Sequence, residues 1–183
     1  LLDYDAKVTM IEMGDRILPL QLDHYAANVY IERLKEEGVD FRFNVRAEKV
    51  IVDENNNPVA IKLNTGEEVP GELIIACTGV RSNVGFLEGS GIECDKFGLI
   101  FNPKGETNVK DVYGAGDISG RNPIWPTAVK EGLIVANNMC NKDIYMEDFF
   151  GSKNTMNFCG VATMSLGTVI KPDDTYEESV EIK

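Results

Sequence analysis

The chain has 183 residues, a net charge of −12, a hydrophobic share of 43% and a charged share of 26%. This composition is typical of a globular protein with one or two domains, and its acidity argues against a nucleic-acid partner. The longest apolar runs, such as residues 73–77, are too short to span a bilayer, so no membrane partner is expected. No secretory signal opens the chain, which favours a cytoplasmic location. The first residue is Leu1 rather than methionine, which favours a processed product or a fragment.

A strand–helix–strand unit is predicted at the start of the chain. Residues 7–13 form an apolar run that predicts a buried strand. Residues 22–37 carry apolar side chains at helical spacing, and Gly38 can end that helix in a left-handed conformation. Residues 39–43 predict the next strand of the same unit.

An antiparallel meander is predicted over residues 45–70. Asn55–Asn57 lie between two apolar runs and indicate a hairpin turn, and Thr65–Gly66 indicate a second turn. Residues 72–79 are apolar nearly throughout and predict a fully buried parallel strand. The meander is therefore expected as an insertion into the parallel unit.

One longer helix is predicted in the second half of the chain. It begins near Pro126, because proline is favoured at the first helical position, and its apolar positions are Val129, Leu133, Ala136 and Met139. The shorter elements predicted around it are a helical turn at 84–89, a hairpin at 92–102 with Gly98 in its turn, a strand at Val112–Tyr113, a strand-like segment at 158–170 and an exposed acidic tail at 173–183.

The run TNVKDVYGAGDISG, residues 107–120, is the strongest candidate for a binding site. It passes from a short apolar strand through Gly114 and Gly116 into Asp117. Glycine lets a backbone approach a ligand without a Cβ in the way, and open α/β sheets bind ligands at the carboxyl ends of their strands. The alternative is that glycine and aspartate only form a loop here.

This run closely resembles the second flavin-binding motif of the pyridine-nucleotide–disulfide oxidoreductase family. The resemblance implies that Asp117, with Gly116 before it, hydrogen-bonds the ribityl chain of FAD. The stretch that follows, NPIWPTAVKEG, strengthens the resemblance.

The same resemblance implies a role for the helix start at Pro126, Thr127 and Ala128. In the family this helix start faces the pyrimidine end of the flavin ring. The backbone N–H groups of Thr127 and Ala128 and the positive end of the helix dipole would stabilise negative charge on the reduced ring. Trp125 would pack beside the ring or in the core, and the core is favoured.

Glu12 ends the first predicted strand and is a candidate nicotinamide-nucleotide ligand. An acidic residue at the end of the second strand of a dinucleotide-binding unit accepts hydrogen bonds from the adenosine ribose and repels the extra phosphate of NADP. The alternatives are a carboxylate with no ligand and a 2′-phosphate tolerated by the nearby Arg16. Thr78 and Gly79 resemble the point where the family's chain crosses to the FAD domain, and Gly79 would line NAD. The family usually has proline where this chain has Ser82.

No GxGxxG fingerprint occurs in the sequence, whereas the family carries two. The resemblance therefore covers the C-terminal portion of a family member. It implies the C-terminal part of an NAD-binding domain over 1–79, the C-terminal part of an FAD-binding domain over 80–146 and the start of an interface domain over 147–183. The implied fold class is α/β, with partial Rossmann-like FAD/NAD(P)-binding domains, the inserted antiparallel meander and a small C-terminal β segment.

The resemblance implies an FAD-dependent NAD(P)H oxidoreductase with FAD and NAD(H) as cofactors. Hydride would pass from NADH to the flavin, and electrons would then pass to an acceptor. Residues 125–132 are most similar to the NADH oxidase, rubredoxin reductase and nitrite reductase branch. The implied partners are a missing N-terminal half or another chain, and further copies in a homo-oligomer.

No catalytic side chain is predicted. The four cysteines are expected as buried or incidental thiols, with Cys159 the best redox candidate among them, and the lone His24 does not favour a metal site. Two alternatives stay open: a catalytically silent module, and a nucleotide-binding or interaction domain. In the family's sheet, a further strand would separate the strands ending at Glu12 and Gly79. Without it, their open edges would be paired by rearrangement or by another chain.

Overall fold

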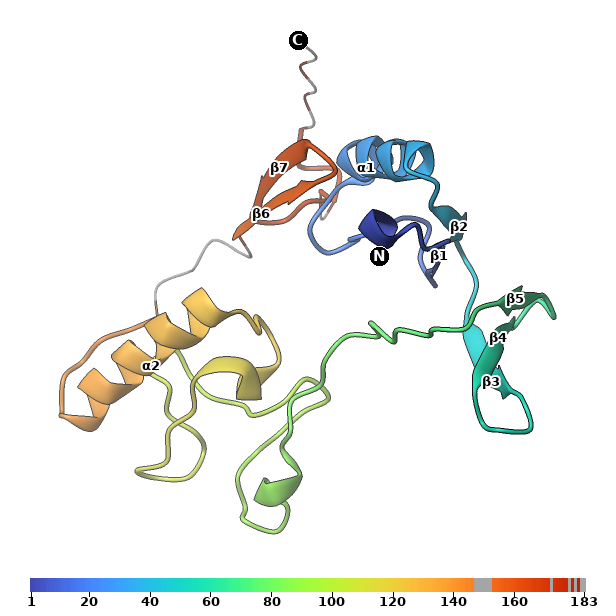
Figure 1. Ribbon diagram of the computed structural model, residues 1–183. Coiled ribbons are helices and arrows are strands. Elements are labelled where there is room, and N and C mark those ends of the chain that lie inside the picture. The colour runs from blue at the N-terminus through green and yellow to red at the C-terminus, as the bar shows by residue number, and fades with distance from the viewer. Residues whose placement is uncertain (147–152, 172, 178, 180, 182–183) are drawn as a thin grey trace. The chain divides into compact units, whose positions relative to one another are not determined.

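The computed structural model describes residues 1–146, 153–171, 173–177, 179 and 181 (Figure 1). The chain divides into two compact units, which are described separately below. The first unit comprises Leu1–Cys77 together with Lys153–Lys183, and the second comprises Thr78–Ser152. No helix among the described residues is both long and apolar enough to cross a membrane.

The first unit contains the predicted strand–helix–strand arrangement. Strand β1 (Thr9–Ile11) runs parallel to β2 (Asp40–Arg42), and helix α1 (His24–Glu36) connects them. The Asp23 carboxylate accepts the Ala26 N–H at 2.8 Å and so caps the start of α1. This part of the prediction is confirmed, although both strands are shorter than the apolar runs that predicted them.

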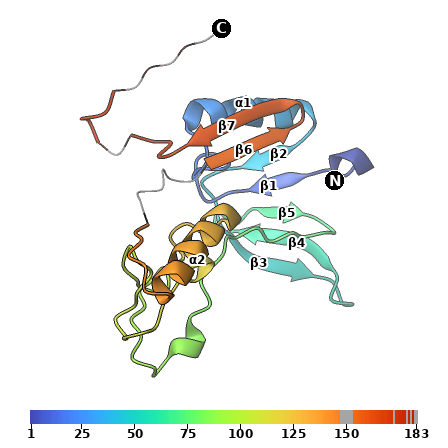
Figure 2. The same ribbon diagram turned by 90° about the vertical axis from the view of Figure 1, so that its left-hand side faces the viewer.

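The core of the first unit lies on α1. Ala27, Tyr30 and Ile31 are buried there. Strands β6 (Lys153–Phe158) and β7 (Val161–Leu166) form an antiparallel hairpin beside this helix, as Figure 2 shows.

Polar bonds attach the hairpin to α1. The Tyr30 hydroxyl donates to the Val161 carbonyl at 2.9 Å, and Arg33 Nε donates to the Cys159 carbonyl at 3.1 Å. The segment 158–170, predicted as strand-like with glycine interruptions, contains β7, and one interruption falls at the turn between β6 and β7. Cys159 and Gly160 take positive φ angles of 49° and 78° and turn the chain there.

The predicted meander is confirmed as strands β3 (Ala47–Val52), β4 (Pro58–Leu63) and β5 (Glu68–Pro70), all antiparallel. The turn between β3 and β4 is closed by Asp53, whose carboxylate accepts the backbone N–H groups of Asn55 and Asn57, each at 2.8 Å.

The buried parallel strand predicted over 72–79 is wrong. This segment has no regular structure, and the side chains of Leu73 and Ile75 are 67% and 60% exposed. A parallel strand exists only where a neighbouring strand takes its hydrogen bonds. Among the described residues β1 pairs with β2 alone, so neither proposed way of closing that sheet is seen within them.

The second unit is mostly loops built around helix α2 (Trp125–Met139). Two short 3₁₀ helices precede it, η2 (Gly85–Leu87) at the predicted helical turn and η3 (Gly116–Ser119) at the glycine-rich run. The hairpin predicted at 92–102 is present as one bridge between Cys94 and Leu99. The strand predicted at Val112–Tyr113 is reduced to one bridge between Tyr113 and Glu106.

Helix α2 exposes the face that the sequence marks as apolar. Val129, Leu133 and Met139 are 45%, 62% and 62% exposed, and Trp125, favoured as a core residue, is 81% exposed. The face of α2 that is buried within its unit is mainly polar. Its buried residues are Thr127, Glu131, Val135 and Asn138. This polar face meets backbone groups of the surrounding loops, which is why it determines the geometry of the site.

Candidate functional site

The glycine-rich loop lies close to other residues of its own unit, where the sequence predicted close approach to a ligand. A Cβ at Gly114 would lie 2.4 Å from Leu99 Cδ2, and the buried Gly116 takes a left-handed φ of +80°. A Cβ at Gly116 would also lie 3.2 Å from the Cβ of Ala128 in the first turn of α2. The loop therefore touches the helix start at a position where only glycine is unstrained.

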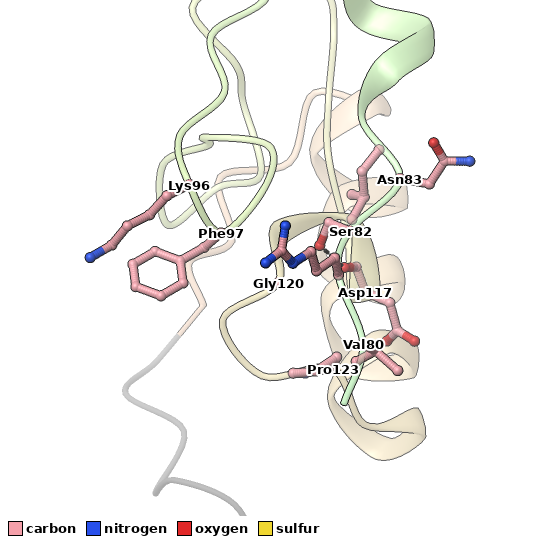
Figure 3. Close-up of a pocket in the computed structure, with 10 residues that line it drawn as sticks. Val80, Ser82, Asn83, Lys96, Phe97, Asp117, Gly120 and Pro123 are labelled. Carbon is pink, nitrogen blue, oxygen red and sulfur yellow. Dashed lines mark hydrogen bonds between the residues drawn. The ribbon is translucent and has the colours of Figure 1, made fainter. Parts of the chain in front are cut away.

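Asp117 is the second residue of the 3₁₀ helix η3, and its side chain is exposed. It borders a hollow of about 440 Å³ (Figure 3). The other lining residues are Val80, Arg81, Ser82, Asn83, Lys96, Phe97, Ile118, Gly120 and Pro123. No hydrogen-bond donor among the described residues reaches the Asp117 carboxylate, so this group is available to a ligand.

Ser82 links the segment of residues 80–83, which lines the hollow, to the glycine-rich loop. Its hydroxyl donates to the Asp117 carbonyl at 2.7 Å, across 35 positions of sequence. The proline that the family usually has at this position has no donor for this bond. Ser82 therefore makes a contact that the family's usual residue could not make. Gly120 permits the arrangement, because a Cβ there would lie 2.8 Å from the Ser82 hydroxyl.

Of the two amides predicted to face a ligand at the start of α2, the structure leaves one unbonded among the described residues. Pro126 lies in the first turn, and Ile124 at the N-cap position provides no side-chain acceptor. The Ala128 N–H donates to the Ile124 carbonyl at 3.0 Å, so the amide predicted to face a ligand is already bonded within the helix. Among the described residues no acceptor takes the Thr127 N–H, which leaves this donor at the positive end of the helix dipole.

Glu131 is a site residue that the sequence interpretation missed. Its side chain is buried, and its Oε2 accepts the Gly116 N–H at 2.6 Å. Burial raises the pKa of the Glu131 carboxyl and the negative charge of Asp117 raises it further, while the bond from Gly116 lowers it. One signal was present in the sequence: Glu131 lies four residues after Thr127 and so shares its face of the helix.

Glu12 lies in the first unit, just after β1, and is half-buried. Its backbone N–H donates to the Arg42 carbonyl at 2.9 Å, which extends the β1–β2 pairing by one residue. Its Oε1 accepts the Gly14 N–H at 2.8 Å, while no donor among the described residues reaches its Oε2. The carboxylate is thus oriented and still has capacity for a ligand.

The Arg16 guanidinium is committed to its own loop. The residue is 7% exposed, and its Nη1 pairs with Asp15 Oδ1 at 2.9 Å. Its Nε donates to the Leu22 carbonyl at 3.3 Å and its Nη2 to the Pro19 carbonyl at 3.2 Å. A guanidinium held at these three points closes the loop from Asp15 to Leu22 and is not free to bind a phosphate.

The remaining predicted residues, Thr78 and Gly79, are exposed in the segment without regular structure, and Gly79 has φ +84°. The structure thus brings Gly116, Asp117, Thr127 and Ala128 together in the second unit, with Pro126 in the same helix turn. Among the described residues no hydrogen bond joins Thr78 or Gly79 to the other predicted site residues.

The four cysteines form no disulfide among the described residues. Cys77, Cys94 and Cys140 are exposed and Cys159 is half-buried, so of the two expectations, buried or incidental thiols, the exposure favours the second. No metal-binding cluster occurs among the described side chains.

Comparisons with known proteins identify what the chain is similar to. A sequence model of the family described as pyridine nucleotide-disulphide oxidoreductase matches residues 1–132. The NAD(P)H sulfur oxidoreductase (CoA-dependent) of Pyrococcus abyssi is 29% identical over 161 residues, covering 81% of this chain and 35% of that protein. The dihydrolipoyl dehydrogenase of Acholeplasma laidlawii is 33% identical over 131 residues, covering 71% of this chain and 38% of that protein.

Solved structures confirm the predicted fold class. The water-forming NADH oxidase from Lactobacillus brevis bound to NADH matches with a TM-score of 0.80 at 19% identity, covering 91% of this chain and 38% of that chain. The chain therefore spans little more than a third of the length of these relatives.

Proposed function

Because the chain belongs to the pyridine nucleotide-disulphide oxidoreductase family, we propose that it acts within an FAD-dependent enzyme that takes hydride from NADH. The observation that carries the proposal is the Gly116–Asp117 turn, held against the first turn of α2. Bound FAD would supply the hydride-accepting centre and pass electrons on to an acceptor. We also propose that an NAD-binding part ends at residue 79 and an FAD-binding part at residue 146. Within the family we propose the branch that includes NADH oxidases.

The groups around Asp117 fit the polar parts of a flavin cofactor. The exposed carboxylate suits the hydroxyl groups of a ribityl chain, and Gly116 before it lets this loop lie close to the first turn of α2. The Thr127 N–H, at the positive end of α2, suits negative charge on a reduced ring. Pro126 and Ala128 shape the same helix turn, the first by fixing its φ and the second by packing on Gly116.

The groups around β1 favour NADH over NADPH as the hydride donor. Glu12 keeps one carboxylate oxygen for ribose hydroxyl groups, and its charge would repel a 2′-phosphate. Arg16, the nearby cation, is held by its own loop. Thr78 and Gly79 are proposed as further nucleotide ligands, since Gly79 would allow close approach to the backbone.

We also propose that the enzyme is cytoplasmic and forms a homo-oligomer. A missing N-terminal half or another chain would complete each copy. Free cysteines suit a reducing compartment. Along β7 the side chains of Met164 and Leu166 are 71% and 61% exposed and alternate with half-buried ones, which gives the C-terminal hairpin an apolar face for a second copy.

Absorption of the purified full-length protein tests the flavin proposal, before and after addition of FAD. Flavin bands that persist through gel filtration are expected. Asp117→Ala should weaken FAD binding about 10-fold or more, because it removes an ionised acceptor. Glu88→Ala is the matched control, since Glu88 is an exposed carboxylate of the same unit. A protein that stays colourless with excess FAD would favour the silent module.

Binding of NADH and of NADPH by the same protein tests the nucleotide proposal. Glu12→Gln removes the charge and keeps an oxygen that can accept the Gly14 N–H. We expect its preference for NADH to fall about 10-fold, while Glu54→Gln, an exposed carboxylate of the first unit, leaves the preference unchanged. Equal preference in wild type and Glu12→Gln would exclude Glu12 as the discriminating residue.

A further inference from the structure

Glu131 is a charged group placed where charge is costly. It lies on the buried face of α2, is 9% exposed, and shares a small cavity with Leu99, Phe101, Ser119 and Arg121. A carboxylate in such surroundings lowers stability unless its hydrogen bonds compensate for lost hydration. Glu131 receives such a bond from the Gly116 N–H at 2.6 Å.

The guanidinium that shares this cavity is engaged elsewhere. Arg121 Nη2 donates to Asp95 Oδ2 at 2.6 Å, and Nη1 donates to the carbonyl oxygens of Leu99 and Ser119 at 3.3 and 3.1 Å. Glu131 therefore does not serve as the ion-pair partner of Arg121. Its described hydrogen bond goes to the glycine-rich loop.

The bond from Gly116 acts on the loop at the residue before Asp117. Gly116 has φ +80° and is the first residue of the 3₁₀ helix η3, in which Asp117 is the second. Two contacts hold this turn on α2: the Glu131 bond and the approach of Gly116 to Ala128. Because the backbone at Gly116 is otherwise permissive, the Glu131 bond selects one of its conformations.

We propose that Glu131 is a positioning residue of the flavin site, which sets the direction of Asp117 by fixing the Gly116 turn. The inference rests on the proposed FAD function and extends it to a residue that does not touch the cofactor. The property that matters is the acceptor oxygen at this place rather than the negative charge. The Glu131 carboxyl therefore acts by holding the backbone at Gly116 in one conformation. Its effect on FAD binding is indirect, because Asp117 makes the contact with the cofactor.

Three substitutions in the full-length protein distinguish the acceptor oxygen of Glu131, its negative charge and the length of its side chain. Glu131→Gln keeps an acceptor and removes the charge, and Glu131→Met keeps the volume and removes the acceptor. Glu131→Asp keeps the charge on a side chain one methylene shorter, so its carboxylate falls short of Gly116. Glu88→Met is the matched control on an exposed carboxylate of the same unit.

Fluorescence titration with FAD and hydrogen exchange of the Gly116 amide without FAD are the two measurements. We expect Glu131→Met and Glu131→Asp to weaken FAD binding about 10-fold or more and to speed exchange at Gly116. We expect Glu131→Gln to bind FAD within about threefold of wild type with slow exchange, because its amide oxygen replaces the acceptor. Glu88→Met should match wild type in both.

Wild-type affinity in Glu131→Met and Glu131→Asp overturns the positioning role while leaving the FAD proposal intact. Loss of affinity in Glu131→Gln also overturns it, because the charge would then be what matters. This second outcome decides the question even where the other two variants do not fold. Absence of FAD binding in wild type rejects the proposed function itself, and the flavin role of Glu131 with it.

Discussion

Helices α1 and α2 use their buried faces in opposite ways. Helix α1 buries Ala27, Tyr30 and Ile31 in an apolar core, whereas α2 buries Thr127 and Glu131 against loops. Burial of apolar area stabilises a fold without fixing particular bond directions, while burial of polar groups stabilises only the arrangement that satisfies them. The comparison teaches that α1 holds its unit together and α2 specifies the conformation of its neighbouring loops.

Removal of Tyr30 should have the largest effect on stability. The ring is fully buried, and its hydroxyl holds the β6–β7 hairpin through Val161. Tyr30→Ala is expected to lower the free energy of unfolding by about 3–5 kcal/mol, measured by urea denaturation. Tyr25→Ala, on the exposed side of the same helix, is the control and should stay within about 0.5 kcal/mol of wild type. Equal losses in the two variants would contradict an α1-centred core.

Asn138 tests the polar face of α2. Its amide donates to the carbonyl oxygens of Lys104 and Ile144 at 2.9 and 2.7 Å and accepts the Ile144 N–H at 2.8 Å. Asn138→Ala leaves these groups without a partner, so we expect a loss of about 2–3 kcal/mol in the same measurement. Asn137→Ala should cost clearly less, because the single described bond of the Asn137 side chain is to the Leu133 carbonyl in its own helix.

The charge of Glu131 should reduce stability at neutral pH. Its folded-state pKa is raised above the ordinary 4.5, chiefly by burial, so the folded state binds the proton more readily than the unfolded state does. The destabilisation is therefore full above the raised pKa and disappears as the pH falls below the unfolded value. Glu131→Gln should melt at a higher temperature than wild type at pH 7, and the difference should shrink towards pH 4. A difference that does not vary with pH would contradict this assignment.

The exposed face of α2 should give the smallest effect. Leu133→Ser in the 183-residue chain is expected to change the free energy of unfolding by less than about 0.5 kcal/mol, because the side chain is 62% exposed. Val135→Ala, on the buried face of the same helix, is the contrasting variant and should cost more. A large loss in Leu133→Ser would mean that this face is covered in solution.

The sequence predicted the elements whose signals are local. Asp23 at the start of α1 and the asparagines between β3 and β4 act on their own neighbours, and both elements formed as expected. The parallel strand predicted over residues 72–79 is not formed, because such a strand depends on a partner strand elsewhere in the chain.

In the candidate site too, local features could be predicted from the sequence and contacts between distant residues could not. The run through Gly116 and Asp117 was recognised from its motif. The bonds from Ser82 to Asp117 and from Gly116 to Glu131 join residues 35 and 15 positions apart, and no short pattern reports them. The apolar positions predicted for α2 lie on its exposed face, and the core position favoured for Trp125 is wrong, while polar residues of the opposite face bond backbone groups of the loops.

The loop closed by Arg16 constrains how nucleotide preference can evolve at the proposed nicotinamide site. Loss of the Glu12 charge alone would not make Arg16 a ligand for a 2′-phosphate, because the guanidinium bonds Asp15, Pro19 and Leu22. Redirecting Arg16 would open the loop that these bonds close. A reversal of preference towards NADPH therefore calls for a new cation, placed at position 12 itself or near it, whereas loss of the Glu12 charge alone would only weaken discrimination.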